Sequence, residues 1–200
     1  EHYRQIASAR ERGALVVTGS GDAFVPLLAG IGDFVHLAGE PWGASIATND
    51  SLSMQCMEAS EARGYARDLC AYMRNYWGSM FLNLSPFGGA FPRPDFCFSI
   101  HACDTHAKWF QTVGEYFGVP YFSVELPIIR GTCEQEKLEY LTGQLHDAIE
   151  WLEKLSGRPY DDSKLIEAAK NYFLSTSLWG DVCLLNQARP APLDEKTMFS

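Results

Sequence analysis

A buried strand that runs directly into a helix, between Asp95 and Trp109, most constrains how this chain folds. Residues 96–100 form a short apolar and aromatic run, which is typical of a buried strand. After it, Asp104 or Thr105 offers a side-chain oxygen that can cap a new helix. Cys103 is therefore expected where a strand becomes a helix. In open α/β sheets, ligands gather outside the carboxyl ends of the strands, where Cys103 is expected. A helix N-terminus also favours an anion such as a thiolate.

The alternation of strands and helices along the chain predicts an α/β fold. Three further apolar runs are expected to be strands, at residues 14–18, 34–37 and 121–126. We expect a polar helix over residues 2–12, a short helix near residues 24–28 and a helical region over residues 50–77 that is interrupted near Gly64. Residues 39–43 and 85–94 are rich in glycine and proline, which favours loops. Together these patterns indicate a parallel sheet of Rossmann or flavodoxin type, covered by helices.

The composition changes after Pro127 and becomes helical. Residues 135–155 are predicted to form one long amphipathic helix, because leucines and isoleucines recur every three or four positions. Asp161 to Ser163 are expected to cap a second helix, and a further helix is expected over residues 178–185. We therefore predict an α/β domain at residues 1–127 and, at residues 128–200, a helical connector that begins a second domain. The chain is expected to be part of a longer polypeptide.

Charge and hydropathy argue against two classes of partner, nucleic acid and the membrane. The net charge is −9 and the pI is about 5.0, whereas nucleic-acid binding needs clustered Lys and Arg. No apolar run approaches the ~20 residues of a membrane helix. The first residues also lack the pattern of a signal peptide, so a cytoplasmic location is expected.

The cysteines raise the question of a metal or cluster site. No two of them have the spacing Cys-x-x-Cys, which excludes the motifs of zinc ribbons and bacterial ferredoxins. A role as small buried hydrophobic residues suits Cys97 in its strand, and also Cys56 and Cys183 on helical faces. Cys133, at the start of the long helix, is ambiguous. Cys70 and Cys103 differ from these because each lies beside polar residues.

The order of several short motifs resembles the benzoyl-CoA reductase/2-hydroxyacyl-CoA dehydratase family. The motifs are Arg67-Asp68-Leu69-Cys70, a proline-rich loop, Pro94-Asp95-Phe96 and His101-Ala102-Cys103-Asp104. The continuation through His106-Ala107-Lys108-Trp109-Phe110 and Gly118-Val119-Pro120 looks most like the benzoyl-CoA reductase branch. The resemblance covers nearly the whole chain, and the 33-residue separation of Cys70 from Cys103 is similar to that of the first two cluster ligands of the family.

This resemblance implies a cofactor and a reaction class. It implies a [4Fe-4S] cluster held by three cysteines, of which Cys70 and Cys103 match the first two. The third is expected in the second domain, beyond Ser200. The main expectation is a subunit of an iron–sulfur enzyme that carries out ATP-driven, low-potential one-electron reduction of an aromatic acyl-CoA. One alternative is a 2-hydroxyacyl-CoA dehydratase subunit, in which an electron is recycled while water leaves. Another is a non-catalytic subunit that relays electrons or supports assembly.

The resemblance also implies partners. These are a homologous second iron–sulfur subunit, an acyl-CoA substrate and an ATP-hydrolysing activator protein that drives the electron uphill. The chain itself lacks a phosphate-binding motif of the Gly-x-x-x-x-Gly-Lys type, so ATP is expected to bind the activator.

Three further residues are candidates for the chemistry of the site, and two of them, Glu40 and His106, have an alternative interpretation. Glu40 follows the second strand and is either an active-site carboxylate that faces the thioester or a solvated loop acid. His101 and His106 flank Cys103, where they could donate protons or tune a cluster. His106, in the first helical turn, could instead serve in packing or capping.

Overall fold

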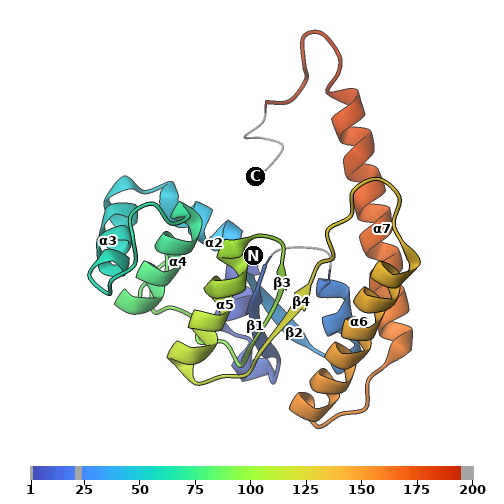
Figure 1. Cartoon of the computed structure of the whole chain (residues 1–200). Coiled ribbons are helices and arrows are strands. Elements are labelled where there is room, and N and C mark those ends of the chain that lie inside the picture. The colour runs from blue at the N-terminus through green and yellow to red at the C-terminus, as the bar shows by residue number, and fades with distance from the viewer. Residues whose placement is uncertain (1, 21–23, 195–200) are drawn as a thin grey trace.

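Four parallel strands form the sheet in the order β2-β1-β3-β4 (Figure 1). The computed structural model describes residues 2–20 and 24–194. The strands are β1 (Leu15–Gly19), β2 (Phe34–Ala38), β3 (Phe96–His101) and β4 (Tyr121–Glu125). Strand order reverses between β1 and β3, so the topological switch point, where α/β proteins bind ligands, lies at the carboxyl ends of these two strands. The expected parallel, helix-covered α/β sheet is confirmed.

Helices cover both faces of the sheet. One layer contains α1 (His2–Ala7), α2 (Gly39–Ala47), α3 (Asp50–Glu61), α4 (Ala71–Leu82) and α5 (Asp104–Phe117). In this layer α3 packs on α4, outside the helices that contact the sheet (Figure 1). The other layer contains the 3-10 helix η2 (Val25–Ile31) and α6 (Gln135–Ser156). The short 3-10 helix η1 (Arg10–Arg12) leads into β1.

The central strands are apolar because both of their faces are buried. Val16 belongs to the core beneath α2, α4 and α5, while its neighbour Val17 belongs to the core beneath η2 and α6. At the carboxyl end of β1, a Cβ atom on Gly19 would lie 1.7 Å from the carbonyl oxygen of Phe98. Only glycine therefore permits this close approach of β1 to β3.

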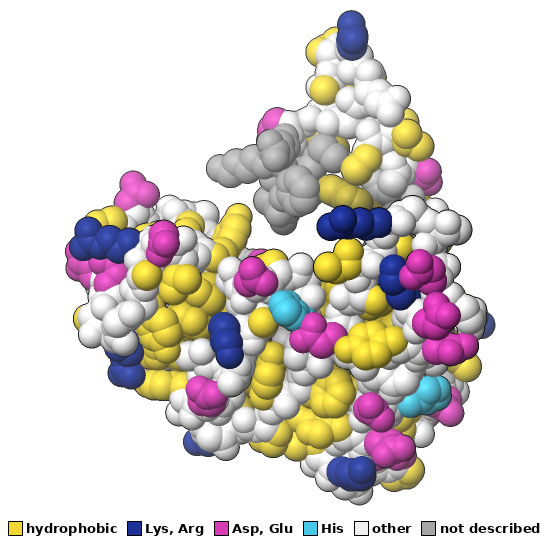
Figure 2. All heavy atoms as spheres, in the orientation of Figure 1, with side chains coloured by type: hydrophobic (Ala, Val, Ile, Leu, Met, Phe, Trp, Pro, Cys, Tyr) yellow, Lys and Arg dark blue, Asp and Glu magenta, His cyan; other side chains and the backbone are white. Residues whose placement is uncertain are grey.

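The last helix, α7 (Asp162–Leu185), begins on the body of the protein and then leaves it (Figure 1). Its N-cap residue Asp161 accepts hydrogen bonds from the backbone amides of Ser163 and Lys164, as the sequence predicts. Its first turns contact η2. Within the described part of the chain, no α7 residue is buried. Yellow hydrophobic side chains are visible along the projecting part in Figure 2.

Several local predictions were wrong. Residues 39–43 form the start of α2 instead of a loop, since Pro41 lies in the first helical turn, where its missing N–H loses no helical partner. Residues 178–185 continue α7 instead of forming a separate helix. The predicted helix over residues 2–12 divides into α1 and η1, and the short helix near residue 24 is the 3-10 helix η2. The single helix predicted at residues 135–155 is confirmed as α6.

In the described part of the chain, we find no helix with the length and apolar character needed to cross a membrane. The boundary that we place at residue 127 stays a prediction. Across it, Ala148 and Leu152 of α6 share a core with Val17 and Phe98 of the sheet.

Candidate functional site

Two of the candidate residues, Glu40 and His106, meet at the carboxyl edge of the sheet. Glu40 lies in the first turn of α2, directly after β2, and His106 lies in the first turn of α5, just beyond β3. The Oε1 atom of Glu40 lies 2.5 Å from the Nε2 atom of His106. The two side chains are only 32% and 12% exposed. A carboxylate and an imidazole at this distance can share or transfer a proton.

Each of the two candidate cysteines is the N-cap residue of a helix. Cys103 precedes α5 and is exposed, while Cys70 precedes α4 and is partly buried. The sequence predicted Asp104 or Thr105 as the cap of α5. The structure instead gives this position to Cys103, whose side chain makes no capping hydrogen bond. Both thiols therefore lie where free backbone N–H groups and the helix dipole favour an anionic ligand or ligand set.

Helix α2 contacts the first turns of both α4 and α5. On α2, Glu40 contacts His106 of α5, and Gly43 lies one turn further along. A Cβ atom on Gly43 would lie 2.5 Å from the carbonyl oxygen of Tyr72, in the first turn of α4. The helix starts that carry Cys70 and Cys103 thus lie against the same short segment of α2.

A buried arginine anchors the segment that leads into Cys70. The backbone amide of Arg74 donates to the carbonyl oxygen of Cys70 at 3.0 Å. Its guanidinium donates to the carbonyl oxygen of Arg67 at 2.8 Å and forms an ion pair with Glu61. Arg67 also donates to Glu61, at 2.8 Å. Sequence reasoning missed this arrangement, although an arginine one turn after Cys70 on a largely apolar helix was a signal.

A second carboxylate–histidine pair lies at the ends of β3 and β4. His101 and Glu125 are register partners, and the His101 Nδ1 atom lies 2.6 Å from Glu125 Oε2. The Asp104 carboxylate is 3.9 Å from the His101 Nε2 atom. Glu125 was not among the predicted site residues. Its position follows from the parallel register, because neighbouring strands end at the same edge.

The other cysteines lie in different environments. Burial raises the pKa of the Cys56 thiol to about 11 and that of Cys97 to about 12, which disfavours the thiolate form that binds metals. The packing roles predicted for these two are confirmed. The packing role predicted for Cys183 is wrong, because this residue is exposed on α7. Cys133 is also exposed.

The described residues were compared with the arrangement that a metal centre needs. Among residues 2–20 and 24–194, no group of three or more His, Cys, Asp or Glu side chains is arranged to hold a metal ion. A cavity of about 750 Å³ is lined in part by Trp42, which lies two positions after Glu40. Positions two apart point to nearly opposite sides of a helix. This cavity and the Glu40–His106 pair therefore lie on different sides of α2.

Known proteins that are similar to this chain belong to one group, the 2-hydroxyacyl-CoA dehydratases. The family described as 2-hydroxyglutaryl-CoA dehydratase, D-component, matches residues 33–200. The chain is 28% identical to the (R)-2-hydroxyisocaproyl-CoA dehydratase alpha subunit of Clostridioides difficile, over 100% of this chain and 49% of that protein. It is 26% identical to the (R)-phenyllactyl-CoA dehydratase alpha subunit of Clostridium sporogenes, over 80% of this chain and 40% of that protein.

A third relative is the (R)-2-hydroxyglutaryl-CoA dehydratase subunit alpha of Acidaminococcus fermentans, at 24% identity over 54% of this chain and 23% of that protein. The chain thus matches about half, or less, of the length of each of these relatives. All three are named as dehydratase subunits. They favour the dehydratase alternative over the benzoyl-CoA reductase branch that the sequence motifs most resemble.

Proposed function

The chain belongs to the 2-hydroxyglutaryl-CoA dehydratase D-component family, and from that premise we propose that it is part of an enzyme subunit that removes water from a 2-hydroxyacyl-CoA. The three relatives compared above are alpha subunits of such dehydratases, with different acyl groups. Reduction of an aromatic acyl-CoA, the main expectation from the sequence, has no support among them. The dehydratase alternative therefore takes its place.

The observation that carries the proposal is the arrangement of Glu40 and His106 between two cysteine-bearing helix starts. The 2.5 Å contact between these side chains forms a proton-transfer pair at the carboxyl edge of the sheet. Cys103 precedes His106 by three residues, and the first turn after Cys70 contacts α2 one turn beyond Glu40. This acid–base pair at the carboxyl edge of the sheet favours a catalytic subunit over the relay or assembly alternative.

The reaction itself explains why proton transfer and electron transfer would both be needed. Loss of water from a 2-hydroxyacyl thioester breaks the C2–OH bond and a C3–H bond, and the hydroxide and the proton leave together as water. The C3 proton is not adjacent to the thioester carbonyl, so the carbonyl alone does not acidify it. An iron–sulfur cluster, when bound, supplies single electrons at low potential, and such an electron changes the reactivity of the thioester.

The cysteines fit such a cluster in part. Cys70 and Cys103 would supply two thiolate ligands, since both thiols are at least partly accessible and both lie at helix N-termini. Cys56 and Cys97 do not fit, because burial raises their pKa values. A third protein ligand would come from outside the described residues.

We assign the proton steps to the Glu40–His106 pair. Glu40 can accept a proton as a carboxylate, and a protonated His106 can donate one to the departing hydroxyl group. The side chain of His106 is only 12% exposed, which limits competition from bulk water for its proton. The substrate is expected to lie against α2, with C2 and C3 near this pair.

The partners belong to the same proposal. We expect a second, homologous iron–sulfur subunit and an ATP-hydrolysing activator that injects the electron. The acyl-CoA would bind between the subunits or domains. The net charge of −9 does not favour nucleic acid as a partner.

Product analysis tests the function. The full-length protein, with its partner subunit and activator, would be assayed anaerobically with (R)-2-hydroxyisocaproyl-CoA and with benzoyl-CoA. We expect a 2-enoyl-CoA from the first, detected by mass spectrometry, and no reduced product from the second. Glu40→Gln and His106→Asn should each lower kcat by about 100-fold or more.

The control is His146→Gln, which changes an exposed histidine on α6. It should leave the turnover unchanged. A dienoyl-CoA formed from benzoyl-CoA, or full turnover in Glu40→Gln, would refute the proposed reaction or the proposed residue roles, respectively.

A further inference from the structure

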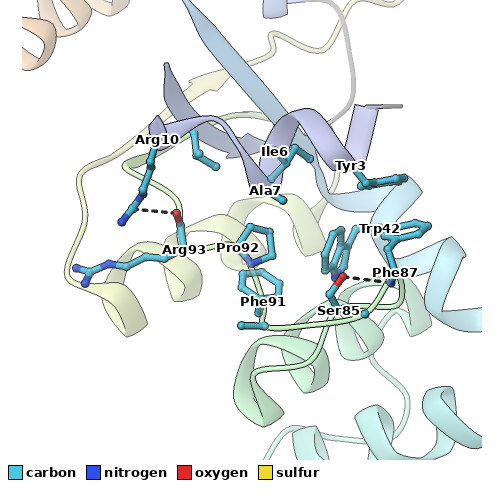
Figure 3. Close-up of a pocket in the computed structure, with 13 residues that line it drawn as sticks. Tyr3, Ile6, Ala7, Arg10, Trp42, Ser85, Phe87, Phe91, Pro92 and Arg93 are labelled. Atoms are coloured by element: carbon cyan, nitrogen blue, oxygen red, sulfur yellow. Dashed lines mark hydrogen bonds between the residues drawn. The ribbon is translucent and has the colours of Figure 1, made fainter. Parts of the chain in front are cut away.

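A half-open cavity of about 750 Å³ lies between α1 and the loop that joins α4 to β3 (Figure 3). Val16 of β1 and Trp42 of α2 contribute to its lining. The loop meets α1 at one end of the cavity and η1 at the other. At one end, the rings of Tyr3 and Phe87 stack with centroids 3.8 Å apart. At the other, Arg10 donates to the carbonyl oxygen of Arg93 at 3.2 Å. The volume lies within the usual range of small-molecule sites.

The two ends of the cavity differ in chemistry. Aromatic rings gather at the end formed by Tyr3, Trp42 and Phe87, whereas Arg10 and Arg93 lie at the opposite end (Figure 3). Arg10 is paired with Asp95 at 3.2 Å, but Arg93 donates to a neutral partner, the carbonyl oxygen of Phe117, at 3.0 Å. None of the described residues that line the cavity is acidic. This end therefore carries a net positive charge, in a chain whose overall charge is −9.

We propose that this cavity binds a small organic carboxylate with an aromatic or branched apolar body. The apolar body would lie against the aromatic rings, and the carboxylate would lie at the arginine end. There the exposed side chain of Arg93, whose guanidinium points away from the rings in Figure 3, would turn towards the cavity and donate hydrogen bonds to it. The proposal does not depend on the dehydratase function, because the cavity lies on the other side of α2 from the Glu40–His106 pair.

The lining favours this class of ligand over a nucleotide. Apart from the two arginines, the described side chains with polar groups that line the cavity are Tyr3, Ser85 and Trp42, and the indole N–H of Trp42 already donates to Ser79. The Ser85 hydroxyl already accepts a hydrogen bond from the backbone amide of Phe87, at 3.2 Å. A purine base and several phosphates would leave many polar groups without partners, which costs affinity.

Titration calorimetry with 3-phenylpropanoate tests the site on the full-length protein, purified with its partner subunit. We expect saturable binding, and binding about tenfold weaker for 3-phenylpropanamide, which has the same shape without the charge. Arg93→Gln should weaken binding of the carboxylate about tenfold and have little effect on the amide. Phe87→Ala should weaken binding of both, because the Phe87 ring closes one end of the cavity. Half of the Phe87 surface is exposed, so this substitution should leave the fold intact.

The matched control is Arg130→Gln, which removes an exposed arginine that does not line the cavity. It should bind 3-phenylpropanoate like the unmodified chain. The proposal fails if no binding is measured, if the amide binds as tightly as the carboxylate, or if AMP binds more tightly than either. Unchanged binding in both Arg93→Gln and Phe87→Ala would also overturn it, and Phe87→Ala keeps the test valid if Arg93→Gln does not fold.

Discussion

At the residue scale, Arg74 shows how a side chain outside the reaction can place a candidate ligand. Its side chain is 9% exposed and joins Glu61 of α3 to the carbonyl oxygen of Arg67, three residues before Cys70. A buried charge requires a compensating partner, so the ion pair and the loop path depend on each other. The consequence is a fixed entry of the chain into Cys70 and α4.

Glu61→Gln should lower the free energy of unfolding by about 2–3 kcal/mol, because it leaves the buried guanidinium of Arg74 without a counter-charge. Urea denaturation measures this change. Alkylation of Cys70 should also become faster relative to alkylation of Cys103. The matched control is Glu58→Gln, an exposed position on the same helix, which should change stability by less than about 0.5 kcal/mol. Equal effects of the two substitutions would show that the ion pair does not anchor the loop.

A second residue-scale effect is the dependence of stability on pH through His36 in β2. Burial lowers the pKa of His36 from 6.5 to about 4, Glu40 opposes the shift and His2 adds to it. The unfolded chain therefore binds more protons than the folded chain between these two pH values, so stability rises with pH in that window. The contribution is present above pH 6.5, is lost as the pH falls towards 4 and amounts to about 3 kcal/mol.

His36→Gln should flatten the slope of unfolding free energy against pH between 4 and 6.5. Urea denaturation at a series of pH values measures this slope. His146→Gln, at an exposed histidine, should keep the slope of the unmodified chain. If both variants retain that slope, groups other than His36 account for the acid sensitivity.

At the element scale, α2 organises the candidate site, and it is the element that the sequence predicted least well. Glycine and proline at residues 39–43 suggested a loop, since both residues are poor helix formers. Here the glycines serve close packing: Cβ atoms on Gly39 and Gly43 would collide with Phe110 and with Tyr72, respectively. Tertiary packing thus overrides local propensity, and single-sequence patterns do not report on it.

Gly43→Ala should destabilise the protein by about 1–3 kcal/mol, because the added methyl group would meet the backbone of Tyr72 and push α4 away from α2. Thermal or urea unfolding gives the size of the loss. The matched control is Gly143→Ala in α6, where nothing lies within 4 Å of the new atom. It should stabilise the protein by about 0.5–1 kcal/mol through helix propensity. A neutral Gly43→Ala would mean that α2 and α4 do not need to pack this closely.

At the scale of the whole molecule, the sheet and its coverage could be predicted from the sequence. Apolar runs such as residues 96–100 have few alternatives to a buried strand, and β3 is found at Phe96–His101. The position of Cys103 between strand and helix followed from the same pattern. The Glu40–His106 contact and the Arg74–Glu61 and His101–Glu125 pairs were not predicted, because each depends on how separate helices and strands pack against one another.

Helix α7 exposes large apolar side chains to water. Among its apolar side chains, Phe173 is 71% exposed and Leu185 is 70% exposed. The helical part that follows residue 127 therefore exposes apolar surface on α7. Contiguous apolar surface of this kind usually meets another protein surface.

We expect the 200-residue chain alone to self-associate and to bind a hydrophobic dye, because water contacts this face of α7. Light scattering and dye fluorescence measure both properties. Phe173→Ser combined with Leu185→Ser should reduce them without a loss of folding stability, whereas Tyr116→Ser, at an exposed aromatic residue of α5, should not reduce them. A monodisperse chain that binds no dye would contradict this expectation.

The central claim is that Cys70 and Cys103 are two thiolate ligands of one iron–sulfur cluster. The most direct test is the iron and sulfide content of the full-length protein, purified anaerobically with its partner subunit, together with its visible absorption and electron paramagnetic resonance spectra. Cys70→Ser and Cys103→Ser should each lose the cluster signals, while Cys133→Ser, at an exposed cysteine that is not one of the candidate ligands, should retain them. Full iron content and unchanged spectra in either Cys70→Ser or Cys103→Ser would contradict the claim.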